Sequence, residues 1–293
     1  MGTLNQLVIG ASIGAVLLLA ALGLTFTFGQ MGVINMAHGE FIMAGAYTAY
    51  VLQPLAGDQA VIVALPVAFA VGGVLGLILE RLIIRRFYGR PLDTLLLTFG
   101  ISLILQQAAR DIFGAPNVQV DAPGWLTGGV DLAGVRIAYN RLFILVLAIG
   151  CVVAISLYLS KLRQGRRMRA VMQNRQLAAV SGVATGRVDQ ATFFIGSGLA
   201  GVAGVALTLI GPVGPTLGTA YIVDAFLVVV AGGLGQLKGA VIAAFVLGVL
   251  NSFVEFWTAN GASFAKVVVF AVIIAFLQFR PQGMFVLKSR ALT

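Results

Sequence analysis

The stretch of this sequence most suited to chemistry is GQMGVINMAHGEF, residues 29–41, where a few polar side chains stand among apolar ones. It holds Asn35, His38 and Glu40, and His38 is the one histidine of the chain. On one helix His38 and Glu40 would point roughly 160° apart, so they could not face the same site. Asn35 and His38, three residues apart, would share a face.

The same stretch predicts a break between two helices. Gly29 and Gly32 interrupt the apolar run, Asn35 occupies a favourable N-cap position, and HGEFIMAGAYTAYVL begins a new helix. Asn35 and His38 could hydrogen-bond a passing polar solute while Glu40 pairs with another helix. Alternatively, the three side chains form a polar network that only holds the broken helix together.

Asp224 is a second candidate of this kind, because it stands in the short apolar run YIVDAFLVVVAGG. A short run broken by glycines is typical of a discontinuous membrane helix that lines a solute path. The segments FGQMGVINMAHGEF and AGGLGQLKGAVIAAF share a G-x-x-G break, which suggests an inverted repeat. Glu255, close to Trp257, is interpreted as an interfacial residue instead.

The composition determines the elements that carry these residues. The chain is 59% hydrophobic and 10% charged, whereas soluble domains are about 25% charged, so a water-soluble fold is excluded. Nearly uncharged windows of roughly 15 to 22 residues predict an all-α polytopic membrane bundle with about eight spanning helices, in one domain over residues 1–293. The windows are Leu7–Phe28, Val61–Leu79, Thr94–Ala109, Leu142–Ser160, Ala191–Ile210, Ala240–Val254 and Phe264–Phe279.

The basic residues predict the orientation of the bundle. Of 19 Lys and Arg residues, 14 fall in three clusters: four from Arg81 to Arg90, seven from Lys161 to Arg187, and Arg280, Lys288 and Arg290. By the positive-inside rule these clusters are cytoplasmic, and the acidic loop of about residues 111–141 is external. With no Lys or Arg before Arg81, we expect an external N-terminus and a cytoplasmic C-terminus. The net charge of +9 is thus explained by topology, not by nucleic-acid binding.

The second basic cluster predicts an amphipathic helix from about Arg166 to Ser181, closed by Gly182. An apolar stripe made of Met168, Val171, Met172, Ala178 and Ala179 runs along it. Such a helix either docks into a groove of a cytoplasmic partner or lies on anionic lipid, and the pattern leaves both interpretations open.

Signatures of catalysis and of metal or cofactor binding are missing from the sequence. It has no HExxH motif and no phosphate-binding GxxxxGK[ST] loop, so ATP would be hydrolysed by another chain. GASIG, residues 10–14, matches G-x-S-x-G but lies inside a long apolar helix, where no nucleophile turn can form. Cys151, the lone cysteine, is expected to be a small core residue.

Four segments resemble the permease subunits of ABC importers for branched-chain amino acids and urea: GVINMAHGEF, RAVMQNRQLAAVSGV, AGGLGQLKGA and RPQGMF. Further segments, such as YGRPLDTLLLTFGISLILQQ and GPVGPTLGTAYIVDAFLVVVAGG, are most similar to the urea type. The resemblance implies an inner-membrane subunit that moves urea by alternating access. A branched-chain amino acid permease and a passive urea or ammonia channel are the alternatives.

The resemblance also implies partners. These are a second, similar permease, two cytoplasmic ATP-binding subunits and an external solute-binding protein. It identifies residues 161–190 as the loop that couples to the ATPases, and we expect docking at Arg169, Met172, Asn174, Ala178, Ala179 and Gly182. Asn35, His38, Glu40 and Asp224 then become expected residues of the solute path.

Overall fold

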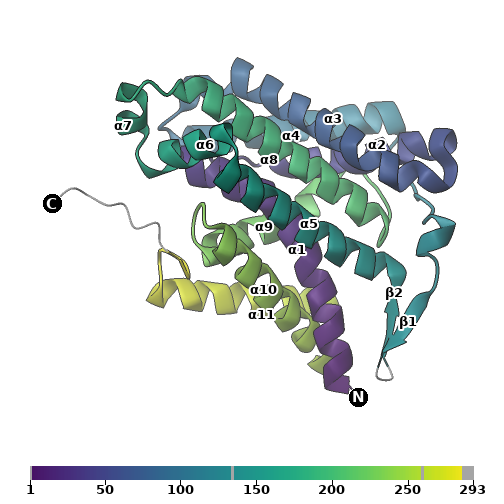
Figure 1. Ribbon diagram of the computed structural model, residues 1–293. Helices are drawn as coiled ribbons and strands as arrows, with labels where there is room; N and C mark the ends of the chain where they lie inside the picture. The colour runs from purple at the N-terminus through teal and green to yellow at the C-terminus, as the bar shows by residue number, and fades with distance from the viewer. Residues whose placement is uncertain (1, 133–134, 259–260, 286–293) are drawn as a thin grey trace.

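A computed structural model describes residues 2–132, 135–258 and 261–285 of the protein (Figure 1). Its long helices are α1 (Gly2–Met31), α2 (His38–Ala56), α3 (Ala60–Leu82), α4 (Pro91–Phe113), α5 (Tyr139–Lys161), α8 (Thr185–Thr208), α9 (Leu217–Gly232), α10 (Leu237–Trp257) and α11 (Gly261–Phe279). Shorter elements are α6 (Arg163–Gln173), α7 (Arg175–Val180) and the 3₁₀ turns Gly57–Gln59, Ile84–Phe87 and Gly124–Leu126.

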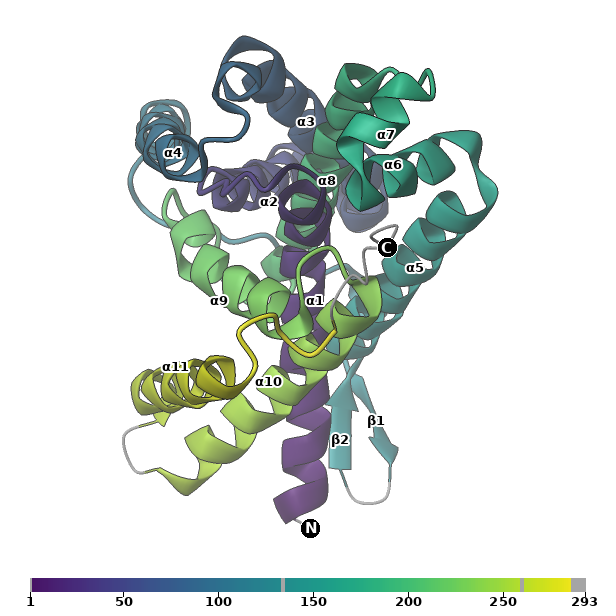
Figure 2. The same ribbon diagram turned by 90° about the vertical axis from the view of Figure 1, so that its left-hand side faces the viewer.

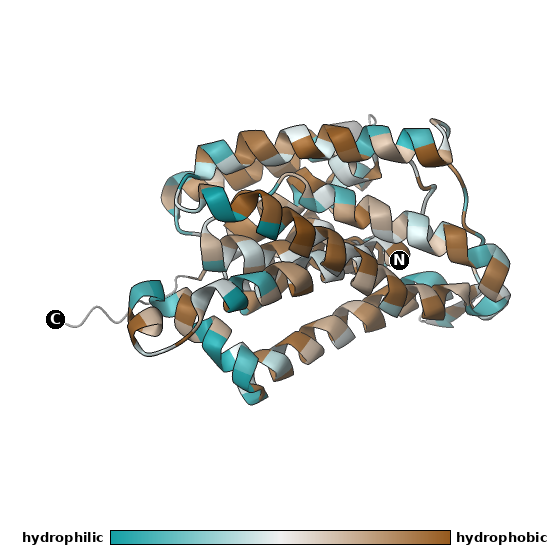
Figure 3. Cartoon of the chain, turned by 90° about the horizontal axis from the view of Figure 1, so that it is seen from above, coloured by the Kyte–Doolittle hydropathy of each residue, from teal (hydrophilic) through white to brown (hydrophobic). Residues whose placement is uncertain are grey.

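The prediction of an all-α polytopic membrane bundle is confirmed. Within the described residues, six helical stretches are long and apolar enough to cross a membrane, one of which, His38–Leu82, contains both α2 and α3. Two shorter apolar helices, Leu217–Gly232 and Phe264–Phe279, accompany them. Figure 3 shows hydrophobic residues along the middle of the helices and hydrophilic residues gathered toward their ends.

One element was not predicted from the sequence. Strands β1 (Gly129–Leu132) and β2 (Val135–Ala138) form an antiparallel hairpin in which Gly129 lies opposite Ala138. The hairpin lies within the loop of residues 111–141, directly before α5.

Helices α1 and α8 form the centre of the bundle (Figure 2). Close approach of α8 to its neighbours depends on small residues. A Cβ atom on Gly201 would collide with the backbone of Ala68 in α3, and one on Gly204 with the backbone of Ile42 in α2. Gly201 and Gly204 therefore allow α8 to pack closely against α3 and α2.

The described basic clusters and the acidic loop lie at opposite ends of the bundle. At one end, Arg81 donates to Gln190 (3.4 Å) beside α6 and α7. At the other, Gln53 near the end of α2 donates to Asp121 of the loop (2.9 Å). Lys288 and Arg290, which complete the third cluster, lie outside the described residues.

Candidate functional site

The chain breaks between α1 and α2, as the glycines predict, but Asn35 does not cap the new helix. Helix α1 ends at Met31, Gly32 has a φ of 63°, and α2 begins at His38 with Ala37 as its N-cap. The predicted cap is wrong because Met36 and Ala37 form a turn that separates Asn35 from the first helical turn. Both polar side-chain atoms of Asn35 are buried without a hydrogen-bond partner in the described part of the chain.

His38 lies against α1. Its side chain is fully buried, and its Nε2 atom is 3.1 Å from the carbonyl oxygen of Ala20. The other ring nitrogen, Nδ1, has no partner among the described residues. In this conformation His38 acts as a link between α1 and α2, which favours the structural role over direct contact with a solute.

Glu40 points away from His38 and faces α4. Its Oε1 atom accepts hydrogen bonds from Ser102 (2.8 Å) and Gln106 (3.0 Å). Its Oε2 atom is buried and has no partner within the described ranges. A buried carboxylate oxygen needs a hydrogen-bond donor, so Oε2 is an acceptor in this arrangement to which a further donor could bind.

The polar face of α4 was missed by the sequence analysis. Thr94, Thr98, Ser102 and Gln106 recur at every fourth position and are buried, although the residues between them are apolar or glycine. Thr98 accepts a hydrogen bond from the amide of Met36 (3.0 Å). It thereby satisfies a backbone group that the helix break exposes and that lipid could not satisfy.

These groups form a continuous polar surface inside the bundle. Gln106 also donates to Thr219 of α9 (3.0 Å), so the surface touches α2, α4 and α9. We call it the polar seam and define it as Glu40, Thr98, Ser102, Gln106 and Thr219. Both donors to Glu40 are neutral groups, and every member of the seam except Glu40 is uncharged. The polar seam therefore presents neutral donors and acceptors and one carboxylate where three helices meet.

Asp224 does not join the polar seam. It lies 3.8 Å from Lys266 of α11, and the pair borders a cavity of about 290 Å³ between α1, α9, α10 and α11. The cavity wall is otherwise largely apolar, with Leu17, Leu247 and Val269 among its members, and Tyr221 and Asn251 beside the charges. Lys266 was not recognised from the sequence because it lies in a window that is otherwise almost uncharged.

The basic segment after α5 forms two helices, not the single one predicted. Asn174 interrupts it and caps α7, since its Oδ1 atom accepts a hydrogen bond from the amide of Leu177 (2.9 Å). An Asn in extended conformation with a free side-chain acceptor starts a new helix more readily than it continues one.

The docking candidates separate into two groups. Arg169, Asn174, Ala179 and Gly182 are exposed and Met172 is partly buried. Ala178 is only 5% exposed, and it packs in the core together with Met168 and Val171. The expected apolar stripe thus faces largely into the protein, whereas Leu177 and Val180 leave apolar surface open at α7.

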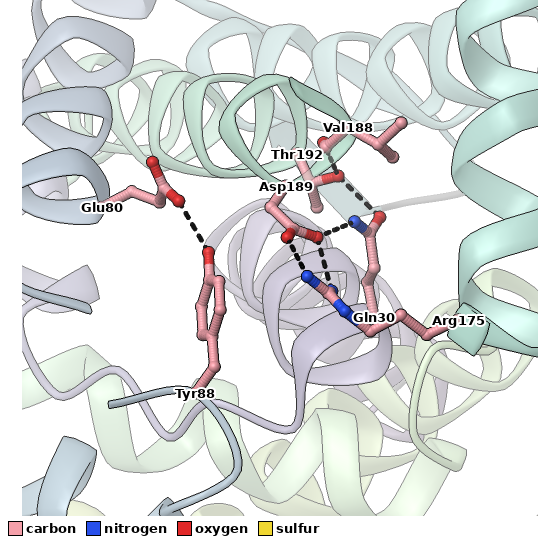
Figure 4. A network of polar contacts seen from close by, with 7 residues as sticks. All are labelled: Gln30, Glu80, Tyr88, Arg175, Val188, Asp189 and Thr192. Atoms are coloured by element: carbon pink, nitrogen blue, oxygen red, sulfur yellow. Dashed lines mark hydrogen bonds and ion pairs between the residues drawn. The ribbon is translucent and has the colours of Figure 1, made fainter. Parts of the chain in front are cut away.

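A second group that the sequence analysis missed joins α7 to the bundle (Figure 4). Arg175 donates to both carboxylate oxygens of the fully buried Asp189 (2.9 and 2.6 Å). Gln30 donates to Asp189 Oδ1 (3.0 Å) and accepts from Thr192 (2.6 Å). The hydrogen bond to Asp189 raises the pKa of Arg175, so its guanidinium stays charged. Asp189 was overlooked because its basic neighbours made it resemble a solvated charge.

Tyr88 lies beside this group. Its ring centroid is 5.4 Å from the Arg175 guanidinium, and its hydroxyl donates to Glu80 Oε1 (2.7 Å). Burial and, secondarily, the hydrogen bond to Glu80 raise the pKa of Tyr88 above its ordinary value. The hydroxyl therefore remains a donor throughout the physiological pH range.

A polytopic helical bundle with a broken first helix, a polar seam in its interior and a basic segment at one end has the architecture of a membrane permease. A family model described as "Branched-chain amino acid transport system / permease component" matches residues 6–277, and the chain belongs to this family. Its members are permease subunits of ABC transporters, which are not themselves enzymes; ATP hydrolysis lies in partner subunits.

Curated relatives agree with this assignment. The chain is 32% identical to the high-affinity branched-chain amino acid transport system permease protein BraD of Pseudomonas aeruginosa, over 96% of this chain and 94% of that protein. It is 28% identical to the permease protein LivH of the corresponding Escherichia coli system, with the same coverage. It is 26% identical to the Escherichia coli ribose import permease RbsC, over 87% of this chain and 78% of that protein. No solved structure matches.

Proposed function

We propose that this chain is one membrane-spanning half of an ATP-driven importer that carries urea along the polar seam. The observation that carries the proposal is Glu40, whose Oε2 atom is buried and has no donor among the described residues, while its Oε1 atom accepts from two neutral groups. Urea is uncharged and offers N–H donors on both nitrogens and a carbonyl acceptor. It would donate to Glu40 and accept from Ser102 or Gln106 as it passes. The segments that resemble urea-type permeases support the same solute.

A branched-chain amino acid is the second candidate, and the names of the relatives favour it over urea. One feature of the bundle also suits it. The cavity beside Asp224 and Lys266 offers a carboxylate for an α-ammonium, an ammonium for an α-carboxylate, and a largely apolar wall. We expect this cavity to bind solute only if the second candidate is correct.

The partners and the orientation are part of the proposal. We infer a complex with a second permease of the same kind, two ATP-binding subunits at α6 and α7, and a solute-binding protein at the opposite end. The basic clusters would lie on the cytoplasmic side of a bacterial inner membrane, which places the N-terminus outside and the C-terminus inside. The separation of the basic clusters from the acidic loop supports this orientation.

The test is transport by the purified complex in proteoliposomes, with radiolabelled urea and radiolabelled leucine measured in parallel. We expect the chain to copurify with ATP-binding subunits and to accumulate urea only when ATP and the solute-binding protein are both present. Accumulation of leucine and not urea would establish the second candidate. Equilibration of urea without ATP, at the same rate as with ATP, would identify a passive channel and refute the importer.

A further inference from the structure

Asp189 is a buried carboxylate that the proposed solute path does not use. Asp189 lies near the start of α8 and is fully buried. The guanidinium of Arg175 donates to both of its carboxylate oxygens (Figure 4). A carboxylate is retained in such a place only when it is paired and hydrogen-bonded. Arg175 is the first residue of α7, so the ion pair fixes the position of that short helix against α8.

The same carboxylate reaches α1. The side-chain amide of Gln30 donates to Asp189 Oδ1 (3.0 Å), and its Oε1 atom accepts a hydrogen bond from the hydroxyl of Thr192 (2.6 Å). Gln30 is the second-last residue of α1, and the break that begins at Gly32 leads directly into α2 and the polar seam. A displacement of α7 would therefore be transmitted through Asp189 and Gln30 to the point where the chain enters the seam.

A second connection leads toward α4. The guanidinium of Arg175 lies over the ring of Tyr88 at 5.4 Å, within the range of a favourable cation–π contact. Tyr88 belongs to the segment between α3 and α4, and its hydroxyl donates to Glu80 near the end of α3. Arg175 is thus linked to both segments that lead into helices of the polar seam. Asp189 and Gln30 link it to the end of α1, and Tyr88 links it to the segment before α4.

We propose that Asp189, Gln30 and Thr192 are positioning residues of the transport cycle, which join α7 to the helix break so that movement of α7 alters the polar seam. The inference rests on the proposed docking of an ATP-binding subunit at α6 and α7. Its rival is a static clamp, in which the same contacts only keep α7 folded and attached. The two differ in whether ATP hydrolysis remains coupled to solute movement when the link to α1 is cut.

The most selective variant is Thr192→Val, which removes the hydrogen bond to Gln30 and leaves the Arg175–Asp189 pair in place. Its matched control is Thr208→Val on the same helix, because Thr208 is also buried but, among the residues the structure describes, donates only to the carbonyl of Val205, one turn earlier. Each variant is purified with its partner subunits and reconstituted. ATP hydrolysis and the uptake of radiolabelled urea and leucine are then measured on the same proteoliposomes.

We expect Thr192→Val to retain the ATP-binding subunits and to hydrolyse ATP while moving about tenfold less solute per ATP, the effect of one lost hydrogen bond. Thr208→Val should match the wild type. Asp189→Asn, which keeps the shape and removes the charge, should show a larger uncoupling. Coupling by Thr192→Val equal to that of Thr208→Val would refute the inference.

Two further results are decisive. If Asp189→Asn loses the ATP-binding subunits, and the complexes that remain move normal amounts of solute per ATP, the contacts are a static clamp. If the wild-type chain itself binds no ATP-binding subunit, the proposed function fails and this inference fails with it. If the wild type and Thr192→Val both couple ATP hydrolysis to solute movement normally, this inference is refuted and the proposed function is not.

Discussion

Replacing Glu40 with Gln isolates the one feature of the polar seam that a solute would use. The substitution preserves the size of the side chain, and the amide oxygen can still accept from Ser102 and Gln106 at the position of Oε1. The atom that changes is Oε2, which has no partner among the described residues and would become an N–H donor. The seam would then present a donor where the solute needs an acceptor.

The expected loss of uptake follows from the change of this one atom from an acceptor to a donor. A buried hydrogen-bonding group left unpaired costs about 1 to 3 kcal/mol, which corresponds to a decrease in uptake of about 5- to 150-fold. The thermal unfolding midpoint should change little, because the contacts to α4 remain. Uptake is measured in proteoliposomes at equal protein content, with Glu255→Gln as the control for the same chemical change at an exposed position. Wild-type uptake by Glu40→Gln would refute the role of Glu40 in the solute path.

Three further predictions follow from individual side chains. His38→Ala should lower the unfolding midpoint in detergent, because it removes the contact with the Ala20 carbonyl and leaves a cavity at a fully buried position, at a cost of about 1 to 3 kcal/mol; an unchanged midpoint would contradict the structural role. Val180→Asp, at a position 83% exposed, should reduce copurification of ATP-binding subunits without changing the midpoint, whereas Ala178→Asp, at a position 5% exposed, should lower the midpoint; the reverse pattern would place the docking surface elsewhere. In a chain without its native cysteine, Asn174→Cys should react with an impermeant thiol reagent only from the cytoplasmic side and Asp131→Cys only from outside; labelling of Asn174→Cys in intact cells would invert the proposed topology.

The helical class and the break after α1 could be predicted from the sequence because both depend on local properties. Long uncharged windows specify membrane helices, and Gly32, with its positive φ, marks where the first one ends, whereas Gly29 lies inside α1. The divergence of His38 and Glu40 also followed from helical geometry alone, and their partners do lie on different helices, α1 and α4.

The partners themselves could not be predicted, because they depend on which helices meet. Ser102 and Gln106 lie more than 60 positions from Glu40 along the chain, and only the packing of α4 against α2 brings them together. Their spacing of four residues, shared with Thr94 and Thr98, was a visible signal of a polar face. Asp189 pairs with Arg175 only 14 positions earlier, but nothing in the sequence showed that it also binds Gln30, 159 positions away.

The most direct test of the central claim, that solute passes along the polar seam, is the reactivity of a cysteine placed within it. Ser102→Cys, in a chain without its native cysteine, is treated with a small hydrophilic thiol reagent in the assembled complex, with and without saturating urea or leucine. Asp131→Cys, at an exposed position in the loop of residues 111–141, is the control. We expect urea to slow the reaction of Ser102→Cys and to leave that of Asp131→Cys unchanged. Equal rates for Ser102→Cys with and without either solute would contradict it.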